Sequence, residues 1–187
     1  MIVLASASPR RAELLASAGI RFAVVPSQII EERLAGEPPD VYVRRLAAAK
    51  ARDVAAGRTA GFVLAADTDV VLDGAVLGKP RDADDARTML ERLSGRVHAV
   101  VTGFEVYDIS RRHTDGGVVQ TRVEFAVLTR AEVDAYVATG EPMGKAGGYA
   151  IQGRAAGMVR RIEGSYTNVV GLPLCEVLET LARMGAL

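Results

Sequence analysis

The sequence predicts an α/β protein whose β-sheet is mixed. Apolar, strand-like runs alternate with stretches of helical periodicity along the chain. Two long strand-like runs, 96–108 and 118–129, are separated only by a polar segment with turn residues, which indicates a hairpin. With 187 residues, of which 49% are hydrophobic, the chain is long enough to bury a core as one domain, 1–187.

The first strand and the first helix are marked by their boundaries. Residues 2–5 (IVLA) form an apolar run typical of a buried strand. Ser8 is a favourable N-cap, Pro9 suits the first helical position, and Gly19 can end the helix. A helix over 9–18 is therefore expected.

Similar signals predict the remaining elements. Aspartates that precede helical stretches act as N-caps, an Asp-Gly pair between apolar runs marks a hairpin turn, and Thr-x-x-Glu is a capping box. In chain order we expect a strand at 21–26, a loop over 27–39, a helix from Asp40 to about Ala56, a strand at 61–67, a hairpin turning at Asp73-Gly74, a helix from Asp82 to Leu93, the two long strands, a short helix capped by Thr129 and Glu132, and a last helix from Pro173. The glycine-rich segment that begins at Gly140 carries no clear signal.

Composition and charge exclude several classes of protein. The 23 basic and 23 acidic residues balance, whereas nucleic-acid binders carry a basic surplus, so we expect no nucleic-acid partner. No apolar run approaches the roughly 20 residues that span a bilayer, and no signal peptide is visible, so we expect a cytoplasmic protein without a membrane partner. The single cysteine, Cys175, fits a reducing compartment, and its apolar surroundings predict a buried position.

Two adjacent arginines occupy the first turn of the first predicted helix. The helix macrodipole is already positive there, so cations are unfavourable unless an anion faces them. Arg10 and Arg11 therefore point to a phosphate-bearing ligand, although paired arginines on a helix often simply face solvent.

Asp67 and Lys79 are further candidates for a phosphate site. Asp67 ends an apolar run, and open α/β sheets bind ligands beyond the carboxyl ends of their strands. Lys79 follows the predicted hairpin in the sequence LGKP. A carboxylate, an ammonium group and the arginine pair could hold a metal and a polyphosphate together. Taken singly, Asp67 is also typical of a turn or a helix cap, and Lys79 of a solvated surface.

Three familiar cofactor motifs are incomplete or absent. GAVLGKP is one residue too short for a P-loop and has Pro80 where a serine or threonine would hold magnesium. No GxGxxG follows a strand and no Cys/His cluster is present, so neither a dinucleotide nor structural zinc is expected. His98 lies within an apolar strand and is expected in the core.

Six motifs in a fixed order give the chain a family resemblance. SASPRR, AADT, LGKP, LSGRVHAVVTG, KAGGYAIQG and GSYTNVVGLPL resemble, from end to end, the motifs of the Maf family of nucleoside triphosphate pyrophosphatases. The resemblance implies a twisted mixed sheet flanked by helices, with two lobes around a cleft, as in inosine triphosphate pyrophosphatases. It also implies cleavage between the α and β phosphates, with a divalent metal cation (Mg²⁺ or Mn²⁺) as cofactor. Family members are often dimeric, which favours a homodimer.

The resemblance also implies roles for individual residues. Asp67 would be the proton acceptor, and Glu31 and Asp67 would be the metal ligands. The substrate-binding residues would be Ser6, Arg10, Arg11, Lys50, Thr68, Lys79 and Gln152. Of these, Arg10, Thr68 and Gln152 match the positions that select the substrate, and they resemble the branch that acts on dTTP and UTP. The amide of Gln152 offers both the donor and the acceptor that a pyrimidine edge requires.

Two positions depart from the family pattern. Ile30 and Gly144 stand where aspartates are common, so a metal site with fewer carboxylates is expected, and the role of the loop around Gly144 is open. Asp69 is interpreted as a solvated strand-end residue rather than a metal ligand. Two other functions stay open: a nucleotide-binding regulator of cell division and septum formation without turnover, and a pyrophosphatase of other specificity, such as for methylated GTP.

Overall fold

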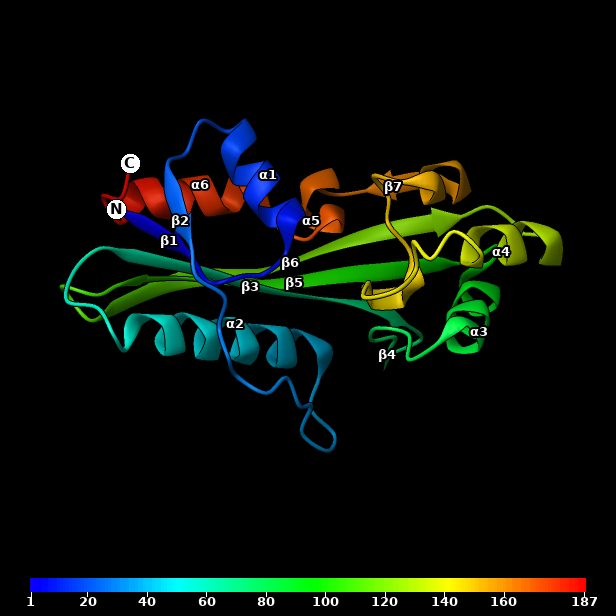
Figure 1. Cartoon of the computed structure of the whole chain (residues 1–187), viewed down its shortest axis with the longest axis horizontal. Helices are drawn as coiled ribbons and strands as arrows, with labels where there is room; N and C mark the ends of the chain where they lie inside the picture. The colour runs from blue at the N-terminus through cyan, green and yellow to red at the C-terminus, as the bar shows by residue number, and fades with distance from the viewer. The chain divides into compact units, whose positions relative to one another are not determined.

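A computed structural model describes all 187 residues and contains a seven-stranded sheet with the strand order β2-β1-β3-β5-β6-β7, in which β4 pairs with β3 (Figure 1). The strands are β1 (Ile2–Leu4), β2 (Phe22–Val24), β3 (Phe62–Leu72), β4 (Ala75–Val76), β5 (Val97–Asp108), β6 (His113–Phe125) and β7 (Val159–Glu163). β1 pairs in parallel with β2 and β3, whereas the β3–β4 and β6–β7 pairs are antiparallel. The predicted α/β class with a mixed sheet is confirmed.

Six α-helices and two short 3₁₀ helices complete the chain. They are α1 (Pro9–Ser17), α2 (Pro39–Ala55), α3 (Ala83–Leu93), α4 (Arg130–Val137), η1 (Ala146–Gly148), η2 (Arg154–Met158), α5 (Tyr166–Val170) and α6 (Leu174–Arg183). None of these helices combines the length and the apolar character needed to cross a bilayer.

The chain divides into two compact units. Unit 1 comprises Met1–Thr68, Thr102–Val119 and Gly171–Leu187, and unit 2 comprises Asp69–Val101 and Gln120–Val170. Strands β3, β5 and β6 contribute residues to both units.

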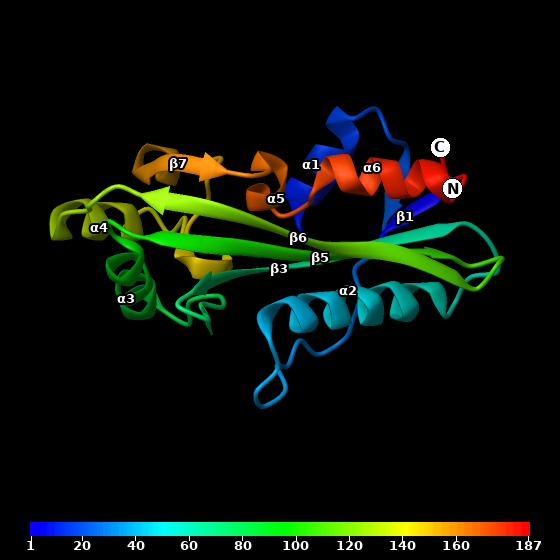
Figure 2. The ribbon, with the colours of Figure 1, turned by 180° about the vertical axis from the view of Figure 1, so that it is seen from behind.

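In unit 1, helices cover both faces of the strands. Helices α1 and α6 lie on one face and α2 lies on the other, as Figures 1 and 2 both show. The apolar stripe of α2 is buried as predicted, with Val43, Leu46 and Ala47 at most 1% exposed. The backbone of α2 approaches β5 so closely that a Cβ atom on Gly103 would lie 2.5 Å from the carbonyl carbon of Val43.

In unit 2, α3 and α4 lie side by side (Figures 1 and 2). An aromatic cluster fills part of the core of this unit. The rings of His98, Phe125 and Tyr149 meet edge to face, with centroids 4.8 to 5.4 Å apart. His98 is 2% exposed, and its Nε2 lies 2.8 Å from the hydroxyl oxygen of Tyr149. The predicted core position of His98 is confirmed.

The helix caps and the hairpin turn lie where the sequence predicts them. The Asp82 side chain accepts a hydrogen bond from the Asp85 amide and caps α3, and Thr129 with Glu132 forms the predicted capping box of α4. The β3–β4 hairpin pairs Leu72 with Ala75, which places its turn at Asp73-Gly74 as expected.

Other boundaries differ from the expectation. Helix α2 begins at Pro39 with Pro38 as N-cap, so Asp40 lies inside its first turn, because proline suits the first helical position. Strand β6 begins at His113, which shortens the expected hairpin end to 109–112. Strand β7 and helix α5 have no counterpart among the predicted elements.

Candidate functional site

The segment between β1 and α1 brings Ser6 and Arg11 together. β1 ends at Leu4 and α1 begins at Pro9, so Ser6 lies in the connection. Ser6 is buried, and its Oγ accepts hydrogen bonds from the Ser8 amide at 3.2 Å and from Nη1 of Arg11 at 3.1 Å. This serine therefore fixes one side of the Arg11 guanidinium group.

Arg11 turns its guanidinium group toward neutral acceptors. Its Nε donates to the carbonyl of Gly171 at 2.8 Å, and its Nη2 donates to Oγ1 of Thr68 at 3.1 Å. Burial lowers the pKa of Arg11, and the negative charges of Asp67 and Glu31 oppose that shift. Because no carboxylate pairs directly with this cation, an anionic ligand beside it would be favoured.

The hydroxyl of Thr68 is fully engaged inside unit 1. It accepts from Arg11, lies 2.9 Å from Oγ1 of Thr102 and donates to the carbonyl of Gly171 at 3.2 Å. A hydroxyl has one proton and two lone pairs, so with Thr102 as the donor these contacts use its whole capacity. Sequence reasoning misses Thr102 and Gly171, although both lie in motifs that carry the family resemblance.

Lys50 joins two carboxylates from different parts of unit 1. Its Nζ, which extends from α2, lies 2.6 Å from Oδ1 of Asp67 on β3 and 2.5 Å from Oε1 of Glu31. The side chains of Lys50 and Asp67 are only 9% and 10% exposed, whereas that of Glu31 is 36% exposed. The buried charges of Lys50 and Asp67 require such pairing. The ammonium group of Lys50 therefore holds the carboxylates of Asp67 and Glu31 close to each other.

The position of Asp67 differs from the sequence prediction. Asp67 lies within β3 rather than at its end, because the strand continues to Leu72. Its parallel neighbour β1 ends at Leu4, which pairs with Leu64, so Asp67 lies beyond the carboxyl end of β1. Its second carboxylate oxygen, Oδ2, accepts no hydrogen bond from the chain, which leaves that oxygen available for chemistry.

Six of the predicted site residues share unit 1 and form two groups of contacts, Ser6 and Thr68 on Arg11 and Glu31 and Asp67 on Lys50, which meet where Asp67 precedes Thr68 on β3. Arg10 also belongs to unit 1; it is half-buried, and its side chain forms no hydrogen bond or ion pair. No group of three or more His, Cys, Asp or Glu residues that could hold a metal is present.

The remaining candidates belong to unit 2. Lys79 is exposed after β4, and Gln152 is exposed in a turn. Asp69 is only 7% exposed, which corrects its interpretation as a solvated strand-end residue. The reason is that β3 extends three residues beyond it and keeps it within the sheet.

Cys175 is exposed, so its predicted core position is wrong. On α6 the buried face carries Val177 and Leu181, and Cys175 falls outside that stripe. Its Sγ lies 3.8 Å from Oε1 of Glu179, whose negative charge raises the pKa of the Cys175 thiol.

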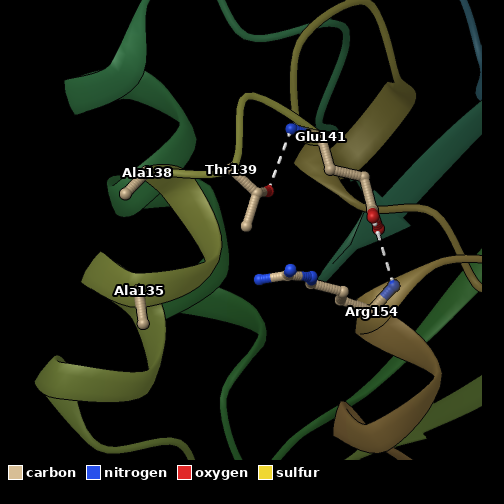
Figure 3. Close-up of a pocket in the computed structure, with 5 residues that line it drawn as sticks. All are labelled: Ala135, Ala138, Thr139, Glu141 and Arg154. Atoms are coloured by element: carbon tan, nitrogen blue, oxygen red, sulfur yellow. Dashed lines mark hydrogen bonds between the residues drawn. The ribbon is translucent and has the colours of Figure 1, made fainter.

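A pocket in unit 2 contains none of the predicted site residues. Figure 3 shows its lining, which consists of Ala135, Ala138, Thr139, Glu141 and Arg154. Two of the hydrogen bonds that anchor Glu141 are drawn in Figure 3, one from its own amide to Oγ1 of Thr139 at 3.1 Å and one from the Arg154 amide to its Oε2 at 3.2 Å.

Comparisons with known proteins give a family and named relatives. Residues 1–184 match the family described as "Maf-like protein". The chain is 59% identical, over all of its length and 96% of the relative's, to a protein of Geobacter sp. (strain M21) named dTTP/UTP pyrophosphatase. A protein with the same name from Geotalea uraniireducens (strain Rf4) is 58% identical over 100% of this chain and 96% of its own length. Another from Myxococcus xanthus (strain DK1622) is 51% identical over 99% of this chain and 93% of its own length.

Proposed function

The chain belongs to the Maf family, and from this membership we propose that it hydrolyses dTTP and UTP to the nucleoside monophosphate and pyrophosphate. The structural observation that carries the proposal is the triad Glu31–Lys50–Asp67 beside the half-buried Arg11, which is hydrogen-bonded to Thr68, the residue after Asp67. Hydrolysis of a triphosphate requires cationic groups beside the negatively charged phosphates and a base that orients water. Lys50 and Arg11 are the cationic groups in this proposal, and Asp67 is the base.

In the proposed reaction, Asp67 is the base. Its Oδ2 accepts a proton from a water molecule while Oδ1 remains bonded to Lys50. The water oxygen forms a bond to the α-phosphorus, and the bond from that phosphorus to the oxygen bridging the α and β phosphates breaks. The electron pair leaves with pyrophosphate, whose negative charge is stabilised by cationic side chains.

The other predicted residues complete the proposal. Ser6, Arg11 and Lys50 would bind phosphate oxygens, and Arg10, which has no partner in the chain, would donate to the substrate directly. Lys79 is proposed to contact a phosphate and Gln152 the base. Because the Thr68 hydroxyl is engaged with Arg11, Thr102 and Gly171, Thr68 would influence substrate choice through Arg11.

The two carboxylates also fit a divalent metal cation. They already hold one cation, the Lys50 ammonium group, and Mg²⁺ commonly takes one or two carboxylates together with phosphate oxygens. Bound by Asp67 and Glu31, Mg²⁺ or Mn²⁺ would neutralise part of the triphosphate charge.

The test is a panel of nucleoside triphosphates scored for pyrophosphate with and without divalent metal. We expect the highest kcat/KM for dTTP and UTP, and a loss of turnover of at least about 10²-fold in Asp67→Asn. Asp40→Asn, at an exposed aspartate of unit 1, is the matched control and should behave like the parent chain.

Each contrary outcome identifies a different error. A preference for methylated GTP or another purine triphosphate would overturn the substrate while leaving the reaction. Tight nucleotide binding without pyrophosphate would favour the regulator of cell division instead. Normal turnover by Asp67→Asn would remove Asp67 from the mechanism.

A further inference from the structure

Gln152 occupies a tight turn in unit 2 that is held at both ends. The Gly153 amide donates to the carbonyl of Ala150 at 3.0 Å, which closes a four-residue turn with Ile151 and Gln152 at its centre. Ile151 is buried, whereas Gln152 is exposed. The turn therefore presents one polar side chain, and its backbone conformation decides where that side chain points.

Tyr136 holds the first residue of this turn. Its hydroxyl accepts a hydrogen bond from the Ala150 amide at 3.1 Å and donates to Oε1 of Glu141 at 2.8 Å. Tyr136 extends from α4 and is only 3% exposed, so its ring is fixed by the core of unit 2. Burial and the adjacent Glu141 carboxylate raise the pKa of Tyr136, which keeps its hydroxyl protonated as a donor.

Glu141 holds the residue that follows the turn. Its Oε2 accepts from the Arg154 amide at 3.2 Å, and its own amide donates to Oγ1 of Thr139 at the end of α4 (Figure 3). Burial raises the pKa of Glu141, but the hydrogen bonds from Arg154 and Tyr136 outweigh this effect and keep the pKa below its ordinary value. A carboxylate that accepts such bonds is a rigid anchor.

Gly153 shows how closely the anchor and the turn fit. A Cβ atom at Gly153 would collide with the carboxylate of Glu141, so only glycine leaves room for the carboxylate at this place. The φ of Gly153 is −106° and thus negative, so the requirement for glycine arises from space and not from a left-handed backbone. An alanine at this position would displace Glu141 without removing it.

We propose that Tyr136 and Glu141 are positioning residues that determine specificity by holding the Gln152 turn at both ends. This inference rests on the proposed function, in which the Gln152 amide recognises a pyrimidine base. Neither residue needs to touch the substrate. Their role is to hold the backbone from which the Gln152 side chain extends, so that its donor and acceptor meet a base edge at a lower cost in conformational entropy.

The test measures kcat and KM for dTTP, UTP and GTP in Tyr136→Phe, Glu141→Gln and Gly153→Ala. We expect KM for dTTP and UTP to rise about fivefold, the effect of losing one hydrogen bond, with kcat within about twofold of the parent value. The preference for dTTP over GTP should fall by the same factor. Glu132→Ala, which removes the side chain that completes the capping box at the other end of α4, is the control for helix stability and should leave KM unchanged.

A double-mutant cycle separates positioning from general destabilisation. If Tyr136 acts through Gln152, Tyr136→Phe should have little further effect on KM in a Gln152→Ala background. An equal rise of KM in both backgrounds would overturn the inference, as would an unchanged dTTP/GTP preference in all three variants. If Tyr136→Phe does not fold, Glu141→Gln and Gly153→Ala take its place in the cycle.

The parent chain distinguishes the two proposals. Parent activity on dTTP and UTP together with unaltered variants would overturn only the positioning role. A parent chain that releases no pyrophosphate from any triphosphate would overturn the proposed function, and this inference with it.

Discussion

Lys50 donates a hydrogen bond from Nζ to Oδ1 of Asp67 across 2.6 Å, and both side chains are about nine-tenths buried. The same nitrogen lies 2.5 Å from Glu31, so one ammonium group serves two carboxylates. A lysine bound in this way fixes the positions of both carboxylates, and in the proposed function it also contributes positive charge toward the phosphates. The carboxylates and the lysine should therefore depend on one another in both stability and activity.

Lys50→Met tests this dependence. The substitution keeps the length of the side chain but leaves the buried Asp67 carboxylate without its donor, which costs about 1–3 kcal/mol. We expect a lower melting temperature and a fall in pyrophosphate release of roughly 10²-fold, because cationic stabilisation is lost as well. Lys50→Arg keeps the charge and should retain more of both properties. Full activity in Lys50→Met would contradict the arrangement.

Thr68→Val tests the support of Arg11. Valine matches the shape of threonine but removes the acceptor for Nη2 of Arg11 and the bonds to Thr102 and Gly171. We expect KM for dTTP to rise about tenfold and the free energy of unfolding to fall by about 1–3 kcal/mol. Thr68→Ser should restore both, since it keeps the hydroxyl. Thr102→Val removes only one partner of Thr68, and an effect on KM as large as that of Thr68→Val would argue against a role through Arg11.

The stability of unit 2 should depend on pH through His98. Burial lowers the pKa of His98 from its ordinary 6.5 to about 4, and Nδ1 has no hydrogen-bond partner. Above pH 6.5 the imidazole is neutral in both folded and unfolded chains. Between pH 6.5 and 4 the unfolded chain gains a proton that the folded chain excludes, so stability falls as pH falls, by at most about 1.4 kcal/mol per pH unit.

The measurement is the free energy of unfolding by denaturant between pH 7 and pH 4. In His98→Gln, a neutral variant, the pH dependence between 6.5 and 4 should be weaker than in the parent chain. Identical slopes in the two proteins would show that His98 does not contribute. His113→Gln, at an exposed histidine of unit 1, is the matched control and should keep the parent slope.

Gly103→Ala should destabilise unit 1. The added methyl group would lie 2.5 Å from the backbone of Val43, which cannot move without shifting α2. We expect a loss of roughly 3 kcal/mol in the free energy of unfolding, the upper part of the range for overpacked cores. At Gly57 a Cβ would meet nothing within 4 Å, so Gly57→Ala should change stability little. Similar unfolding curves for the two variants would contradict the close packing of α2 on β5.

The sequence by itself determines the features that depend on neighbours in the chain. The cap at Asp82, the capping box of Thr129 and Glu132, and the turn at Asp73-Gly74 each involve bonds over at most four residues, so local residue types are sufficient to predict them. The ordered motifs likewise indicate the family, which the match over residues 1–184 confirms. The roles that these motifs suggest for individual residues stay predictions.

Only the tertiary structure decides how those residues meet. Arg11 bonds to Gly171, 160 positions away, and Lys50 reaches Asp67 across 17 positions and across the α2–β3 interface. The exposure of Cys175 and the burial of Asp69 likewise depend on which face a neighbouring element covers. Local signals cannot encode these outcomes, because burial and long-range hydrogen bonds arise only when separate elements pack together.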